Sequence, residues 1–103
     1  MTEDVVATAR SVNGVPVRLT AERWAHITER HGVMRGRQTD VIGVIESPDG
    51  VYEGREETLM AIRREDTLYL VVIYKETSVA DGFVVTAYVT RRFAQRKSIW
   101  TPR

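Results

Sequence analysis

The chain has 103 residues, of which 43% are hydrophobic and 28% are charged, and its formal net charge is +1 at pH 7. This length supports one hydrophobic core, so we expect a single domain over residues 1–103. The chain has no cysteine, which excludes disulfides and thiolate zinc sites. No apolar run approaches the roughly 18 residues of a membrane helix, and the acidic N-terminus is unlike a signal peptide. We therefore expect a cytoplasmic protein without membrane association.

The first residues predict an N-terminal hairpin or arm over residues 1–19. Two short apolar runs flank Asn13-Gly14, a dipeptide typical of tight turns between strands. Pro16 has no amide hydrogen to donate to a neighbouring strand. We therefore expect this piece to be an edge strand or an extended arm.

Two helices follow in the predicted order. The first covers residues 21–31, with Thr20 as its N-cap and Gly32 as a left-handed residue after its end. The second is capped by Thr39 or Asp40 and runs to about residue 46. A Ser-Pro-Asp-Gly turn then stops it.

The first predicted helix carries both histidines of the chain. Each helical residue advances roughly 100°, so Trp24, Ile27 and His31 share an apolar stripe. His26 and Arg30, four residues apart, share a neighbouring face. We expect Trp24 and Ile27 to anchor the helix to the core, with His26 and Arg30 along its edge as one wall of an active site.

The rest of the chain predicts strands at about 51–56, 59–63, 68–75 and 83–90, with a loop through residues 76–82. The run 68–75 is apolar on both faces, which is typical of a central strand. The sequence thus predicts an α+β fold, with two N-terminal helices packed on one face of a four- to five-stranded antiparallel sheet.

The last predicted strand has two different faces. A period of two places Phe83, Val85, Ala87 and Val89 on one side, and we expect this apolar side to meet the helices. The opposite side, with Thr86, Tyr88 and Thr90, would then be exposed and functional.

No motif in the sequence indicates a metal or cofactor site. The two histidines are five residues apart and diverge by roughly 140° on a helix, and no zinc-binding helix motif is present. Neither a serine nucleophile elbow nor a glycine-rich phosphate loop occurs. We therefore expect chemistry without metal or cofactor.

Five side chains remain as the candidate catalytic set: His26, Arg30, His31, Thr86 and Tyr88. Such side chains can cleave RNA by internal transfer, because a histidine moves protons near neutral pH while cations and hydroxyls hold the charged phosphorane. A structural role remains open for His31, which lies on the apolar stripe, and for the strand residues Thr86 and Tyr88. His26 is the least easily explained by packing and is the expected proton carrier.

The C-terminal segment, residues 89–103, is basic. It holds five cations and no acid, whereas the other 88 residues hold 10 cations and 14 acids. Arginine suits forked phosphate contacts, and the candidate RNA-binding residues are Thr90, Arg91, Arg92, Arg96 and Lys97. A solvated basic tail is the alternative interpretation.

Three motifs in order resemble a known family: Trp24-Ala25-His26-Ile27-x-x-Arg30-His31, then Val41-Ile42-x-x-Ile45-x-x-Pro48, then Val84-Val85-Thr86-Ala87-Tyr88-x-Thr90. The combination is similar to small phage- and toxin-associated nucleases of the barnase–EndoU–colicin–RelE-like superfamily. The resemblance covers the chain from about Leu19 to Trp100. It implies an α+β fold and metal-independent endoribonuclease activity. It also implies His26 as a general acid or base, with Arg30, Thr86 and Tyr88 as phosphate or catalytic contacts.

The leading hypothesis is therefore a toxin-like or phage-derived endoribonuclease whose partners are RNA and an antitoxin or immunity protein. One alternative is a non-catalytic nucleic-acid-binding or protein-interaction module that uses Tyr52, Tyr69, Tyr74 and Tyr88. Another is a different small hydrolase that uses His26 on a nucleotide or another phosphodiester. The sequence predicts neither the RNA substrate nor the oligomeric state.

Overall fold

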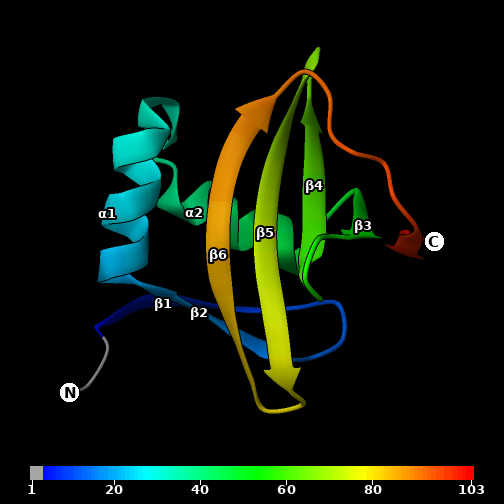
Figure 1. The fold of residues 1–103 in the computed structure, drawn as a ribbon, viewed down its shortest axis with the longest axis horizontal. Coiled ribbons are helices and arrows are strands. Elements are labelled where there is room, and N and C mark those ends of the chain that lie inside the picture. The colour runs from blue at the N-terminus through cyan, green and yellow to red at the C-terminus, as the bar shows by residue number, and fades with distance from the viewer. Residues whose placement is uncertain (1–3) are drawn as a thin grey trace.

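The computed structural model describes residues 4–103, so the first three residues of the expected hairpin or arm lie outside the described part (Figure 1). Seven strands, two α-helices and one 3-10 turn follow one another along the described chain. They are β1 (Val5–Arg10), β2 (Pro16–Thr20), α1 (Ala21–Arg30), η1 (Gly32–Met34), α2 (Gln38–Glu46), β3 (Gly50–Glu53), β4 (Leu59–Glu65), β5 (Leu68–Ser78), β6 (Asp81–Thr90) and β7 (Ser98–Trp100).

The strands form one mixed sheet, and the predicted fold class was wrong. The order is β1-β2-β6-β5-β4-β3-β7, so the sheet has seven strands rather than four or five. The β1–β2 hairpin extends one end of the sheet, and the C-terminal segment adds β7 at the other. The helices follow β1 and β2 and so are not N-terminal. The pairing of β2 with β6 is parallel, which makes the sheet mixed.

The parallel contact between β2 and β6 is short and strongly twisted. Only Val17 and Arg18 pair with β6, and the hairpin runs nearly across the long strands (Figure 1). The side chain of Arg18 holds the crossing through two bonds to Asp81, Nε to Oδ1 at 2.8 Å and Nη2 to Oδ2 at 3.0 Å. Pro16 is tolerated because it is the first residue of β2, ahead of the residues that pair with β6.

Glycine is required where β2 meets β6. A Cβ on Gly82 would lie 2.6 Å from the carbonyl oxygen of Lys75, which belongs to the rigid backbone of β5. Gly82 pairs with Val17 on one side and Glu76 on the other. The three strands can therefore approach one another here only because residue 82 has no side chain.

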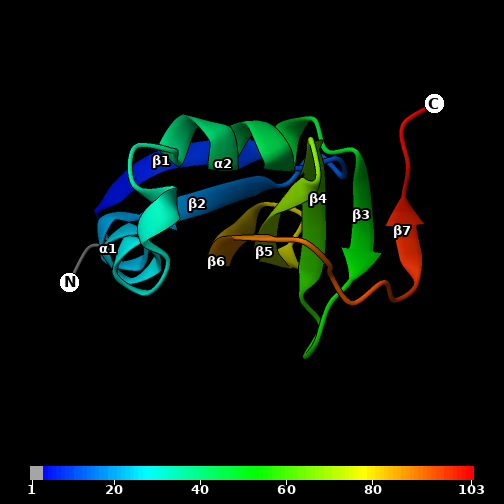
Figure 2. The same ribbon diagram turned by 90° about the horizontal axis from the view of Figure 1, so that it is seen from above.

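The main core lies between the sheet and the helices. Figure 2 shows α2 along one side of the sheet, with α1 at the β2–β6 side. The largest fully buried side chains of this core include Leu19, Ile27, Met34, Ile45, Leu70 and Tyr74. As predicted, β5 is the central strand, and it is buried on both faces: Leu70 and Val72 face this core, whereas Val71 belongs to a second cluster on the opposite face.

The helix ends agree only partly with the prediction. Thr20 is confirmed as the N-cap of α1, because its Oγ1 accepts a hydrogen bond from the Arg23 amide at 3.1 Å. Gly32 is not left-handed. It begins the 3-10 turn η1, and His31 is the C-cap residue of α1. The expected caps of the second helix are also displaced, since α2 begins at Gln38 after an N-cap residue, Arg37, that makes no side-chain cap.

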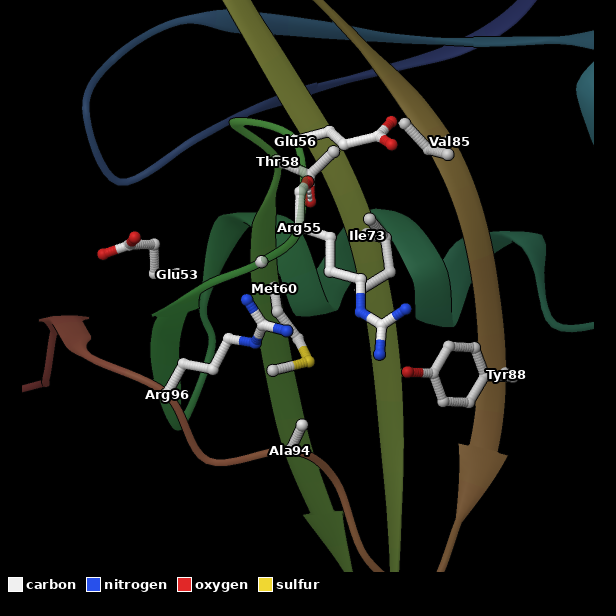
Figure 3. A pocket seen from close by; sticks show the side chains of 11 residues that line it. Glu53, Arg55, Glu56, Thr58, Met60, Ile73, Val85, Tyr88, Ala94 and Arg96 are labelled. Carbon is white, nitrogen blue, oxygen red and sulfur yellow. Dashed lines mark hydrogen bonds between the residues drawn. The ribbon is translucent and has the colours of Figure 1, made fainter.

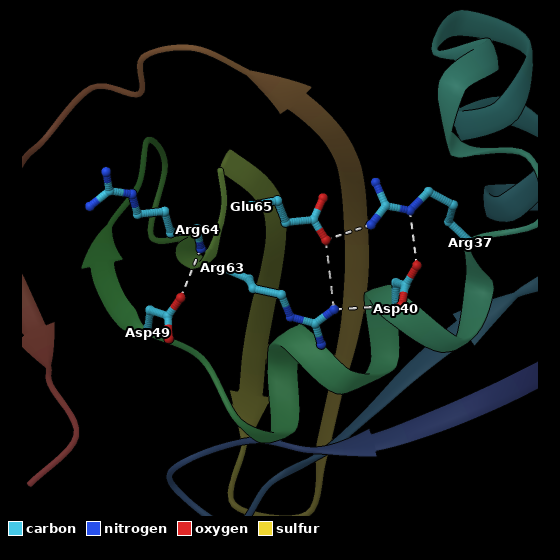
Figure 4. A network of polar contacts seen from close by, with 6 residues as sticks. All are labelled: Arg37, Asp40, Asp49, Arg63, Arg64 and Glu65. Carbon is cyan, nitrogen blue, oxygen red and sulfur yellow. Dashed lines mark hydrogen bonds and ion pairs between the residues drawn. The ribbon is translucent and has the colours of Figure 1, made fainter. Parts of the chain in front are cut away.

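A group of two arginines and two acids joins α2 to β4 (Figure 4). Arg37 binds Glu65 at 2.6 Å and Asp40 at 2.9 Å, and Arg63 lies 3.5 Å from Asp40. The hydrogen bond from Arg37 lowers the pKa of Asp40, and the bond to Glu65 raises the pKa of Arg37. Asp40, expected to be a helix cap, thus serves instead to fix the start of α2 against the end of β4.

A bulge in β6 changes which residues face the helices. The register with β5 shifts between Ile73 and Tyr74, so Val84 is buried on the same side as Ala87 and strict alternation fails. Val85, expected on the helix side, lines a pocket on the other face. The predicted loop over 76–82 is also wrong, because β5 continues to Ser78 and β6 begins at Asp81.

Candidate functional site

A pocket of about 390 Å³ opens on the sheet face opposite α2 (Figure 3). Its floor is apolar and consists of Met60 from β4, Ile73 from β5 and Val85 from the bulge of β6. The turn between β3 and β4 forms one wall, and the segment after β6 forms another. The complete lining is Glu53, Gly54, Arg55, Glu56, Thr58, Met60, Ile73, Val85, Tyr88, Ala94 and Arg96.

The β3–β4 turn, residues 54–58, is tightly closed and strained. The Gly54 amide donates to the Thr58 carbonyl at 2.8 Å, and the Thr58 hydroxyl donates to the Arg55 carbonyl at 2.6 Å. Glu56 and Glu57 have φ of 51° and 64°, a region that non-glycine residues rarely adopt. Such residues cost of order 1–3 kcal/mol each and cluster at functional sites. The turn carries Arg55 over the pocket (Figure 3).

Tyr88 and His31 meet beside this pocket. Their ring centroids are 5.8 Å apart and the rings are tilted by 41°. Tyr88 comes from β6 and lines the pocket, with its hydroxyl directed toward the guanidinium of Arg55 (Figure 3). His31 is half-buried and directly follows α1. Its main-chain N–H bonds the Ile27 carbonyl at 2.8 Å, which fixes it as the helix cap.

Tyr88 is partly desolvated by its burial. Desolvation disfavours the charged phenolate and raises the pKa of Tyr88 above its usual value of 10.0. At neutral pH the group is therefore a hydrogen-bond donor rather than a base. Thr86 lies on the same sheet face, since Ile73 pairs with Thr86 and Val71 pairs with Tyr88, but its side chain is not part of the pocket lining.

Two guanidinium groups line the pocket from different walls. Arg55 belongs to the β3–β4 turn and Arg96 to the segment after β6, and both side chains are exposed. Neither forms an ion pair with any residue that the structure describes. Both can therefore bind an anionic ligand. Glu53 and Glu56 also line the pocket, so its cations and acids are balanced.

The structure does not bring all the predicted site residues together. His26 and Arg30 are exposed on α1 and do not line the pocket, whereas His31 and Tyr88 are neighbours. The Thr90 hydroxyl donates to the Arg92 carbonyl at 2.6 Å and thus belongs to a local turn.

The predicted cations after β6 are distributed unevenly. Arg91, Arg92 and Lys97 are exposed and do not line the pocket, whereas Arg96 does. Sequence reasoning missed Arg55 and Thr58. The available signal was an arginine in a five-residue connection that begins with glycine between two short strands, a pattern that predicts a tight hairpin loop.

Among residues 4–103, no group of three or more His, Asp or Glu side chains is placed to hold a metal ion. None of the helices described is long and apolar enough to cross a membrane.

A neutral tyrosine hydroxyl, two unpaired guanidinium groups and a half-buried histidine can bind a phosphate and move a proton beside it. No protein family model, no curated protein and no solved structure matches the chain.

Proposed function

We propose that the protein is a metal-independent endoribonuclease of toxin or phage-derived type. The observation that carries the proposal is the contact of His31 with Tyr88, which lines a pocket together with Arg55 and Arg96. In the proposed reaction, the ribose 2′-hydroxyl attacks the adjacent phosphorus, the bond to the 5′-oxygen breaks, and a 2′,3′-cyclic phosphate forms. One proton leaves the 2′-oxygen and one reaches the 5′-oxygen, and a single histidine side chain can accept the first and donate the second.

The proposed roles follow from the chemistry of each group. Arg55 and Arg96 contact the non-bridging oxygens of the phosphate and stabilise the extra charge of the phosphorane. Tyr88, which stays protonated, donates a hydrogen bond to the same oxygens. His31 carries a proton to or from the ribose oxygens.

The proposal assigns the proton carrier to His31 rather than His26. The sequence favours His26 because His31 shares the apolar stripe with Trp24 and Ile27. The stripe faces the core at Ile27, which is buried. His31, at the end of the stripe, instead contacts Tyr88 of β6. His26 is exposed on the same helix and therefore provides a matched control.

The test is cleavage of total RNA and of tRNA by the purified protein in EDTA, with analysis of the product ends. We expect cleavage with 2′,3′-cyclic phosphate ends. His31→Ala should reduce the rate by about 10²–10⁴, the usual contribution of a positioned proton carrier, and His26→Ala should have little effect. Tyr88→Phe should reduce the rate by about 10-fold or more while it keeps the ring contact with His31.

Three outcomes would contradict the proposal. A strict requirement for added magnesium or zinc would exclude internal transfer by side chains alone. Loss of cleavage in His26→Ala with full activity in His31→Ala would reverse the assignment of the histidines. Binding of RNA without cleavage would favour a non-catalytic module, although the four tyrosines expected to serve such a module are not equally accessible, because Tyr74 is fully buried.

A further inference from the structure

The segment that joins β6 to β7, residues 91–97, crosses the open face of the sheet, and we name it the C-terminal strap (Figure 2). Both of its ends are held by hydrogen bonds. At the start, the Thr90 hydroxyl bonds the Arg92 carbonyl at 2.6 Å. At the end, the Glu53 amide donates to the Lys97 carbonyl at 2.8 Å, and β7 then pairs with β3.

Between these ends, an aromatic residue anchors the strap to the sheet. The ring of Phe93 packs against Tyr52 of β3 at a centroid distance of 5.2 Å and against Tyr69 of β5 at 5.0 Å. The two interplanar angles, 54° and 76°, are tilted and edge-on geometries that aromatic pairs favour. A side-chain bond from Gln95 Nε2 to the Tyr52 hydroxyl, at 3.4 Å, is longer and exposed.

Phe93 is the half-buried residue of a strap whose other side chains are exposed. It belongs to the apolar cluster of Met60, Ile62 and Val71, which lies on the pocket side of the sheet. Removal of the ring would therefore free the middle of the strap while its two ends stay attached. The residues that depend on this part are Ala94 and Arg96, which form one wall of the pocket.

The position of Arg96 depends on the strap, because its guanidinium makes no ion pair with a residue in the described part of the chain. We propose that Phe93 is a positioning residue for RNA binding, which acts by holding Arg96 at the pocket. This inference rests on the proposed function, since it takes the ligand of Arg96 to be an RNA phosphate.

The test exploits the fact that phenylalanine has no charge. A cation that contacts a phosphate releases counterions, and for single strands each such contact contributes about 0.7 to the slope of log Kd against log salt. Arg96→Ala should therefore reduce the slope by about 0.7. Phe93→Ala should reduce it by up to the same amount, although it removes no charge, and the double variant should match Arg96→Ala alone.

The probe is a fluorescently labelled single-stranded 2′-O-methyl oligoribonucleotide, which cannot be cleaved by internal transfer, titrated with the full chain at several salt concentrations. Val41→Ala is the control, because Val41 is fully buried in α2 on the opposite side of the sheet. It should lower the thermal midpoint but leave the salt slope unchanged. Phe93→Tyr, which keeps an aromatic ring, should retain the wild-type slope, and Phe93→Leu covers the case in which Phe93→Ala does not fold.

The outcomes separate this inference from the proposed function. An unchanged slope in folded Phe93→Ala or Phe93→Leu, with a reduced slope in Arg96→Ala, overturns the inference while RNA cleavage by the wild type still supports the function. Equal reductions of the salt slope in Phe93→Ala and Arg96→Ala support the inference. If the wild type binds RNA but does not cleave it, the same result overturns the proposed enzymatic activity. A wild type that shows no salt-dependent binding of the oligoribonucleotide overturns both.

Discussion

Gly32→Ala distinguishes the helix end predicted by the sequence from the one in the structure. A left-handed glycine after α1 would make alanine unfavourable by about 1–2 kcal/mol. In the structure, Gly32 is the first residue of a 3-10 turn without a positive φ, and no heavy atom lies within 4 Å of an added Cβ. Alanine then fits without strain and restricts the unfolded chain, so we expect stabilisation by about 0.4–1 kcal/mol.

The measurement is urea unfolding followed by far-UV circular dichroism, together with the thermal midpoint. For a domain of this size, the expected gain corresponds to an increase of roughly 2–6 °C. Gly14→Ala is the control, because Gly14 has φ of 79° and equally open surroundings. It should lose about 1–2 kcal/mol through backbone strain alone. A similar loss in Gly32→Ala would refute the structure of the segment that positions His31.

Three further changes test the packing and the charges. Tyr74→Phe should stabilise the protein by about 1 kcal/mol in urea unfolding, because the Tyr74 hydroxyl is buried without a hydrogen-bond partner among the described residues; destabilisation would show that the hydroxyl is satisfied. Gly82→Ala should cost about 1–3 kcal/mol in the same assay, since its Cβ would meet the backbone of β5 at 2.6 Å. A neutral effect would argue against the β2–β6 pairing. Hydrogen bonds from arginines lower the pKa values of Asp40 and Asp81 below 3.8. The two carboxylates therefore stabilise the folded state above pH 3.8, and this stabilisation is lost as the pH falls through their lower folded-state pKa values. The thermal midpoint should fall over this pH range, and it should fall less steeply in Asp40→Asn. Equal slopes in the two proteins would contradict the role of Asp40.

The local sequence was sufficient to predict most of the helices and strands. Thr20 followed by the Trp24–Ile27 spacing predicted the first helix, and the structure places α1 at Ala21–Arg30. The apolar run from Leu68 predicted a central strand, and β5 is central. These features are encoded by neighbouring residues, because capping, helical periodicity and two-sided burial act over one element at a time.

The candidate site was only partly predictable for the same reason. Of the residues that the sequence named, Tyr88 and Arg96 line the pocket, and His31 contacts Tyr88 without lining the pocket. The sequence favoured His26 as the proton carrier, and this stays a prediction beside the proposed role of His31, because a helical period shows which residues share a face but not which neighbour that face meets. Arg55 escaped notice because its position depends on a turn of unusual φ values.

The sequence by itself determined that α1 begins after Thr20 and that β5 is apolar on both faces, since those properties depend on residues a few positions apart. Tertiary structure alone decided that β2 pairs in parallel with β6, that Gly82 admits this crossing, and that β7 returns to β3. It also decided that the bulge in β6 turns Val85 toward the pocket. Each of these outcomes depends on contacts between segments distant in the chain, where backbone pairing and close packing select one register among several that the local pattern allows.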